Sequence, residues 1–171
     1  MTATATEVAL LSDTHVPHRA EGIPDWVADR VRAADHAIHA GDFDSPEALS
    51  RVRDLVGGDD RLTAVRGNTD PRGLDLPRVA TVDLGGVTFV VTHGNGPPGT
   101  YRERVARRVR EHADTDAVGV CGHTHQLLDE RIGDVRLLNP GTATGASPGT
   151  ETSMLVLSVA DGRLDVTPHR R

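Results

Sequence analysis

Two histidines, His123 and His125, follow the apolar segment 117–121 and are separated by a single residue. At the end of a β-strand, side chains two residues apart point to the same side, about 7 Å apart along the backbone. Both imidazoles can therefore reach one cavity. Because neutral imidazole is the commonest metal ligand among side chains, this pair predicts a metal site, provided that other segments supply further ligands.

Four more apolar segments end on residues that can bind a metal ion. These residues are Asp13 and His15 after 8–11, Asp42 after 37–40, Asn68 after 62–65, and His93 after 87–92. In sheets with parallel strands, binding sites form beyond the carboxyl ends of the strands, so we expect all seven side chains to meet at one edge. An aspartate or asparagine alone is also a typical turn residue. Only the complete set predicts metal binding.

The ligand set contains nitrogen and oxygen and no thiolate. It suits Mn, Fe, Co, Ni or Zn, and it argues against a cysteine-rich structural zinc site. Seven ligands are too many for one ion and fit two, particularly if one carboxylate bridges, so we expect two divalent transition-metal ions, with Mn as the preferred choice. Paired ions about 3.5–4 Å apart are the usual arrangement for displacement at phosphorus. The expected substrate is therefore a phosphate ester.

The segments that position these residues predict alternating strands and helices, followed by strands alone. Expected strands cover 8–11, 37–40, 62–65, 79–84, 87–92, 117–121, 127–132, 135–138, 154–159 and 164–167, and expected helices cover 25–34, 47–56 and 101–112. Ser45 and Pro46 supply an N-cap and a first-turn proline, and Thr100 with Glu103 matches a capping box. This pattern predicts one domain, 1–171, with two mixed sheets packed face to face and helices outside.

Several other residues have simpler interpretations. We expect His39, inside a strand, to be packed or to support the site, and we expect His36 and His169 to lie on the surface. The arginines in 102–110 alternate with apolar residues at helical spacing, which is typical of a solvated amphipathic helix rather than a nucleic-acid patch.

Composition limits the partners and the compartment. The net charge is −6, and the 19 basic residues are all arginine, so a polymeric nucleic acid is disfavoured as a ligand. The single cysteine, Cys121, cannot form an intrachain disulfide, which favours a reducing, cytoplasmic location. There is no signal-peptide pattern and no run of 18 apolar residues, so a membrane span is not expected. The sequence leaves open whether the chain forms a homo-oligomer.

The motifs taken together resemble those of the calcineurin-like metallophosphoesterase superfamily. In chain order they are D-x-H at 13–15, G-D at 41–42, G-N-x-D at 67–70, H-G at 93–94 and G-H-T-H at 122–125. The match extends from Leu10 to Gly141. The short length and the segment 139–142 resemble the small bacterial and archaeal single-domain phosphodiesterases of that superfamily.

The resemblance implies a fold and a set of roles. The fold is an α/β, four-layer α/β/β/α sandwich of two mixed β-sheets flanked by helices. One ion would be bound by Asp13, His15 and His125, the other by Asn68, His93 and His123, and Asp42 would bridge both. The attacking group would be a bridging hydroxide, positioned by Asp42, with Asn68 and His93 also in catalytic roles. The Asn68 amide could in addition orient the phosphoryl oxygen.

One position departs from the superfamily. Many members have a histidine directly after the asparagine, placed to protonate the leaving group, whereas this chain has Thr69. The small phosphodiesterase branch often lacks that histidine too. We therefore expect esters with good leaving groups to be cleaved well and alkyl esters poorly. Asp70, like Thr69 beside the ligands, is expected to hold the Asn68 loop by hydrogen bonds rather than to bind an ion.

Three candidates for substrate binding lie close to these ligands in sequence. His18 and Arg19 continue directly from His15, and Asn95 follows His93 by two residues. An arginine beside two metal ions can bind a non-bridging phosphate oxygen, but it can equally be solvated. The three residues are therefore candidate substrate contacts.

Three functions are compatible with the sequence. The first is a phosphodiesterase acting on a small diester or nucleotide-like ester, and the second is a phosphomonoesterase using the same ions. The third is a non-catalytic scaffold, like the retromer subunit that shares the fold but has a degraded metal site. All seven expected ligands are present here, which disfavours the scaffold.

Overall fold

Two five-stranded mixed sheets are formed by the residues that the computed structural model describes, 3–114 and 116–171. The first sheet has the order β10-β9-β1-β2-β3 and the second has the order β4-β5-β6-β8-β7. The strands are β1 (Thr6–Leu11), β2 (His36–His39), β3 (Leu62–Ala64), β4 (Val79–Leu84), β5 (Val87–Thr92), β6 (Val118–Val120), β7 (Leu127–Ile132), β8 (Val135–Pro140), β9 (Ser153–Ala160) and β10 (Arg163–Arg170).

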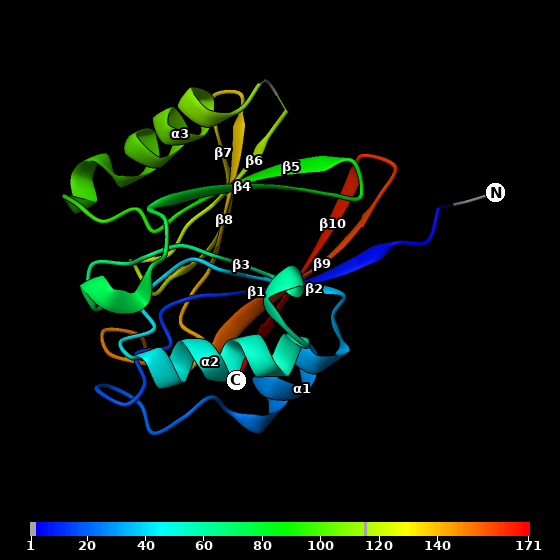
Figure 1. Cartoon of the computed structure of the whole chain (residues 1–171). Helices are drawn as coiled ribbons and strands as arrows, with labels where there is room; N and C mark the ends of the chain where they lie inside the picture. Colours follow the sequence, from blue (N-terminus) through cyan, green and yellow to red (C-terminus); the bar gives the residue numbers. More distant parts are fainter. Residues whose placement is uncertain (1–2, 115) are drawn as a thin grey trace.

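Helices cover the outer face of each sheet. The helices α1 (Asp25–Ala33) and α2 (Pro46–Val56) lie on the first sheet, and α3 (Tyr101–His112) lies on the second (Figure 1). The order of layers is therefore α/β/β/α, and the expected fold class is confirmed. No helix in the ranges 3–114 and 116–171 is both long enough and apolar enough to cross a bilayer.

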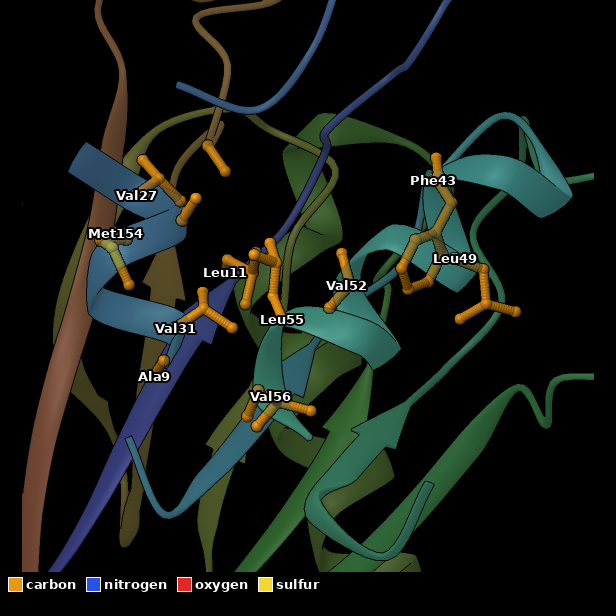
Figure 2. Close-up of a cluster of buried hydrophobic side chains, with 14 of the residues drawn as sticks. Ala9, Leu11, Val27, Val31, Phe43, Leu49, Val52, Leu55, Val56 and Met154 are labelled. Carbon is orange, nitrogen blue, oxygen red and sulfur yellow. The ribbon is translucent and has the colours of Figure 1, made fainter. Parts of the chain in front are cut away.

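Strand β1 shows how the layers are held together. Its side chains alternate between the two faces of the sheet. Ala9 and Leu11 pack against α1 and α2, as Figure 2 shows for this cluster, whereas Val8 and Leu10 pack between the two sheets. All four side chains are completely buried. At about 25 cal/mol per Å² of apolar surface, burial on both faces is the main source of stability.

The ends of α2 form as the sequence predicts. The Ser45 hydroxyl accepts a hydrogen bond from the amide of Ala48 at 3.1 Å, and Gly57 ends the helix in the left-handed conformation at φ 98°. The capping box expected at α3 is wrong, because Thr100 makes no side-chain cap. Its hydroxyl instead accepts a hydrogen bond from the Arg104 guanidinium at 2.7 Å.

The histidines of β2 are both buried. His39 stacks on Phe43 with ring centroids 3.6 Å apart, and burial lowers its pKa to about 3, so the ring is neutral. This confirms the packed role expected for it. The surface position expected for His36 is wrong, since the residue is 9% exposed and its Nε2 lies 2.8 Å from the Thr63 hydroxyl of neighbouring β3.

Parallel strand pairing brings together the loops that carry the candidate metal-binding residues. In the first sheet β1, β2 and β3 run parallel, and in the second β5, β6 and β8 run parallel. The chain segments that leave these strands therefore emerge at common edges of the two sheets. They carry the seven residues expected to bind metal.

Candidate metal centre

Asp13, His15 and His125 form one compact group. Their ligand atoms lie within 4.8 Å of one another. The Nε2 atoms of His15 and His125 are 3.2 Å apart, and His125 Nε2 lies 3.2 Å from Asp13 Oδ1. All three residues are buried. Residues 110 positions apart in the sequence thus surround a single point.

Asp42, His93 and His123 form a second group, also with ligand atoms within 4.8 Å of one another. The closest pair is His93 Nε2 and Asp42 Oδ2, at 3.1 Å. Asn68 completes this group, because its Oδ1 lies 3.0 Å from His93 Nε2 and 3.0 Å from His123 Nδ1.

Asp42 lies between the two groups. Its Oδ2 is 3.5 Å from His15 Nε2 in the first group and 3.1 Å from His93 Nε2 in the second. Its Oδ1 accepts a hydrogen bond from the Thr69 amide at 3.0 Å. One carboxylate oxygen therefore faces both groups while the other is held by the backbone. The structure brings all seven side chains together, and that each binds an ion stays a prediction.

The backbone at these residues is unusual. Five of the seven have positive φ angles, namely Asp13 at 54°, His15 at 48°, Asp42 at 63°, His123 at 73° and His125 at 58°. Positive φ is uncommon for residues other than glycine and often marks a functional site. Strand β6 ends at Val120, so the reason given for His123 and His125 pointing together, an extended strand end, is wrong. Left-handed turns instead send the two rings into different groups.

Hydrogen bonds orient three of the imidazoles so that Nε2 faces the centre. The Nδ1 atom of His93 donates to the Ala40 carbonyl at 2.7 Å, and that of His125 donates to the Ala146 carbonyl at 2.8 Å. The Nδ1 atom of His15 lies 2.9 Å from Asp44 Oδ1. When Nδ1 carries the proton, Nε2 presents a lone pair. These outer bonds are the kind that position metal-binding histidines.

A cation fits this arrangement. Among residues 3–114 and 116–171, the buried Asp13 Oδ1 has no hydrogen-bond partner, and it faces the lone pairs of His15 and His125. A buried carboxylate oxygen without a partner is costly, and two imidazole lone pairs 3.2 Å apart repel each other. A divalent cation removes both costs, and a nitrogen and oxygen donor set is suitable for a transition metal.

Without metal, the acidic and basic groups shift each other's pKa. Burial by itself raises the pKa of Asp13 and Asp42, but their contacts with His125, His15 and His93 outweigh it, so both are lowered. Burial by itself lowers the pKa of His93, yet the hydrogen bond to Asp42 and the charge of Asp13 raise it to about 9. Metal-free protein therefore holds a proton on His93 at neutral pH, and metal must displace it.

Metal-free protein should lose stability as the pH rises from about 6.5 to about 9. The pKa of His93 rises from 6.5 to about 9 on folding, so its contribution is complete below the lower value and is lost as pH passes through the higher one. The loss is up to about 3 kcal/mol. Melting curves of chelator-treated protein between pH 6 and pH 10 would measure it. His93→Gln should flatten the curve, and an unchanged slope in that variant would contradict the assignment.

Asp70 binds backbone amides from two loops of the centre. Its two carboxylate oxygens accept hydrogen bonds from four backbone amides, those of Asp42, Phe43, Asp44 and Gly67, at 2.7–2.9 Å. It ties the loop after β2 to the loop after β3. Thr69, in the loop after β3, adds a second contact between these loops, because its hydroxyl donates to the Asp44 carboxylate in the loop after β2.

The three expected substrate contacts lie at the surface around the centre. His18 is 68% exposed, and its Nδ1 lies 3.3 Å from Asp44 Oδ2. Arg19 donates to the Ser147 carbonyl at 3.0 Å, which ties its loop to the segment that holds His125. Asn95 is exposed and lines a groove together with Asn68.

Sequence reasoning missed the groups that orient the histidines. Asp44 follows Asp42 by two residues, and that spacing was a usable signal in the sequence. The carbonyls of Ala40 and Ala146 carried none, because any residue supplies a carbonyl. Only the folded chain shows which carbonyl faces which ring.

The sequence matches a known family and several characterised or named relatives in it. Residues 7–162 match the model of the calcineurin-like phosphoesterase superfamily domain. A probable metallophosphoesterase of Methanothermobacter thermautotrophicus is 31% identical over 159 residues, covering 92% of this chain and 88% of the relative. A phosphodiesterase of Methanocaldococcus jannaschii is 25% identical over 161 residues, covering 85% of this chain and 89% of the relative.

Solved structures share the fold. The zinc complex of Vps29 from Entamoeba histolytica has a TM-score of 0.77 at 27% identity, covering 96% of this chain and 98% of that one. Vacuolar protein sorting 29 from Cryptosporidium parvum has a TM-score of 0.76 at 22% identity, covering 99% of each chain. The family match spans nearly the whole described chain and includes every residue of the two groups. This chain belongs to the calcineurin-like phosphoesterase superfamily.

Proposed function

We propose that this protein is a phosphodiesterase that hydrolyses a small phosphodiester or nucleotide-like ester and uses two divalent metal ions. The observation that carries the proposal is the pair of adjacent three-residue groups, in which the Asp42 carboxylate of the second group also faces His15 of the first. The phosphodiesterase named among the relatives, although only 25% identical, supports a diester over a monoester. The single buried cysteine, Cys121, agrees with the cytoplasmic location that we include in the proposal.

The residues would divide between the two ions as their positions suggest. Asp13, His15 and His125 would hold one ion, Asn68, His93 and His123 the other, and Asp42 both. When bound, such a pair lowers the pKa of water towards neutrality and neutralises phosphoryl oxygens. Mn is the preferred choice, and Ni, Fe, Co and Zn share the same ligand preferences.

The protein's own groups prepare the site for an anionic ester. The carbonyls of Ala40 and Ala146 fix the rings of His93 and His125, so these rings need no reorganisation when substrate arrives. The Asn68 side chain is exposed beside the second group. Its amide can contact a phosphoryl oxygen and orient the ester.

Metal analysis and paired substrates test this proposal. Purified protein should contain two transition-metal ions per chain and, with Mn²⁺, should cleave bis(4-nitrophenyl) phosphate faster than 4-nitrophenyl phosphate. Faster cleavage of the monoester would favour the phosphomonoesterase. Two bound ions without hydrolysis of either compound would favour the non-catalytic scaffold, the alternative supported by the likeness to Vps29.

Leaving-group dependence gives a separate prediction. The Thr69 hydroxyl donates its proton to the Asp44 carboxylate, so it is not free to protonate a departing alkoxide. General acid catalysis is typically worth about 10²–10⁴-fold. The leaving group of methyl 4-nitrophenyl phosphate needs no proton, whereas that of dimethyl phosphate does. The kcat/KM value for the aryl diester should therefore exceed that for the alkyl diester by at least about a hundredfold. Comparable kcat/KM values for aryl and alkyl diesters would show that another residue acts as the acid.

A further inference from the structure

An open groove with a volume of about 370 Å³ begins at the candidate metal centre. Asn68 lines the groove and also contacts His93 and His123 through its Oδ1, at 3.0 Å in each case. Asn95 lines it as well. The groove therefore adjoins the second group of the centre on the side of Asn68.

Three arginines from separate segments line the same groove. Arg66 follows β3, Arg78 precedes β4, and Arg108 lies on α3. The amide of Arg66 donates to the carbonyl of Pro77 at 2.8 Å, so the backbone holds the first two arginines side by side. None of the described residues that line the groove is a carboxylate. In a chain of net charge −6, this is a local concentration of positive charge.

The arginine charges are available to a ligand. In the described parts of the chain, Arg66 and Arg78 form no ion pair, and Arg108 has only a distant one, 3.6 Å from its neighbour Glu111 on the helix surface. Arg78 and Arg108 are exposed, and Arg66 is half-buried. The guanidinium fork matches the oxygens of a phosphate group, and the Asn95 amide adds a further donor.

We propose that this groove binds a second phosphate of the substrate, so that the preferred substrate is a phosphodiester that also carries a terminal phosphate. The inference rests on the proposed function, because it assumes that the scissile phosphate lies at the metal centre. The three arginines act on the substrate's far end. They select the substrate and take no part in bond cleavage.

A matched pair of dinucleotides tests the preference. Diadenylate and its 5′-phosphorylated form contain the same diester and differ only in the terminal phosphate. With metal-loaded protein, kcat/KM should be at least about tenfold higher for the phosphorylated form, mainly through KM, which is the effect of one charge-assisted contact. The preference should shrink as salt rises from 0.05 to 0.5 M, because these exposed charges are screened.

Single substitutions assign the effect to the groove. Arg66→Gln, Arg78→Gln and Arg108→Gln should each reduce the preference by about tenfold or to nothing, with little change on diadenylate. Arg107→Gln is the matched control, because Arg107 is exposed on the same helix and does not line the groove. Equal kcat/KM for the two dinucleotides, or a preference that all three groove variants retain, would overturn the inference.

Binding to chelator-treated protein separates this inference from the proposed function. Calorimetric titration should show tighter binding of the phosphorylated dinucleotide, and Arg78→Gln should abolish the difference. If metal-loaded protein hydrolyses neither dinucleotide nor bis(4-nitrophenyl) phosphate while this binding difference persists, the phosphodiesterase proposal fails and the groove still binds phosphate. If both dinucleotides are hydrolysed and bind equally, the groove assignment fails alone.

Discussion

Asp42→Asn should lower phosphodiester hydrolysis by about a thousandfold, or about 4 kcal/mol in transition-state stabilisation, and should remove metal from both positions. The Asp42 carboxylate faces His15 of one group and His93 of the other, at 3.5 and 3.1 Å. Asparagine keeps an oxygen for the Thr69 amide but has no negative charge. Loss of that charge weakens both sites at once.

Asparagine is the sharper substitution at this position, and the chain offers a matched control. Asp42 has φ 63°, a conformation that asparagine tolerates better than alanine does. Asp161, in the turn between β9 and β10, has φ 50° and is exposed, so Asp161→Asn repeats the chemical change far from the centre. Metal content and kcat/KM would be compared for both variants. Two bound ions and full turnover in Asp42→Asn would refute the bridging role.

Asp70→Ala should destabilise the metal-free protein by about 3–5 kcal/mol. The buried Asp70 carboxylate accepts four backbone hydrogen bonds of 2.7–2.9 Å. Alanine leaves all four amides without their partner. Each orphaned amide costs about 1–3 kcal/mol, and the costs overlap because the amides share one site.

Asp70→Asn refines this prediction. Each carboxylate oxygen accepts two of the four bonds, so an amide keeps at most two of them and turns an NH₂ group towards two N–H donors. The free energy of unfolding of Asp70→Asn should lie between the values for wild type and Asp70→Ala. Asp129→Ala is the control, because Asp129 makes two 2.8 Å bonds with Arg136 near the surface, where an ion pair is worth about 0–1 kcal/mol. Urea unfolding of chelator-treated proteins would rank the three, and equal values for Asp70→Ala and Asp129→Ala would contradict the argument.

Local sequence patterns predicted the bounds of several strands and helices closely. The hairpin of β4 and β5 has the bounds predicted from its apolar runs and Gly85-Gly86 turn, and α2 begins beside the predicted N-cap Ser45. Apolar periodicity and capping chemistry depend on neighbours in sequence, so they can be detected without the fold. Thr100 shows the limit, since its hydroxyl bonds the Arg104 side chain rather than the helix backbone.

The pairing of strands that are distant in the sequence could not be predicted from the sequence. Strand β9 pairs with β1, where Thr6 lies opposite Val159, so the first and last parts of the chain share one sheet. The predicted list of strands does not specify which sheet each joins. That choice depends on which apolar faces pack together across the whole chain, as the separate clusters on the two faces of β1 show.

The sequence by itself determined the family, the fold class and the seven residues expected at the centre, because residue types and their order along the chain carry that information. Only the tertiary structure decided which nitrogen of each oriented ring faces inward, which backbone carbonyls hold the rings, and that Arg66, Arg78 and Arg108 share one groove. The physical reason is that these properties depend on contacts between residues distant in sequence and on left-handed backbone turns, which spacing along the chain does not encode.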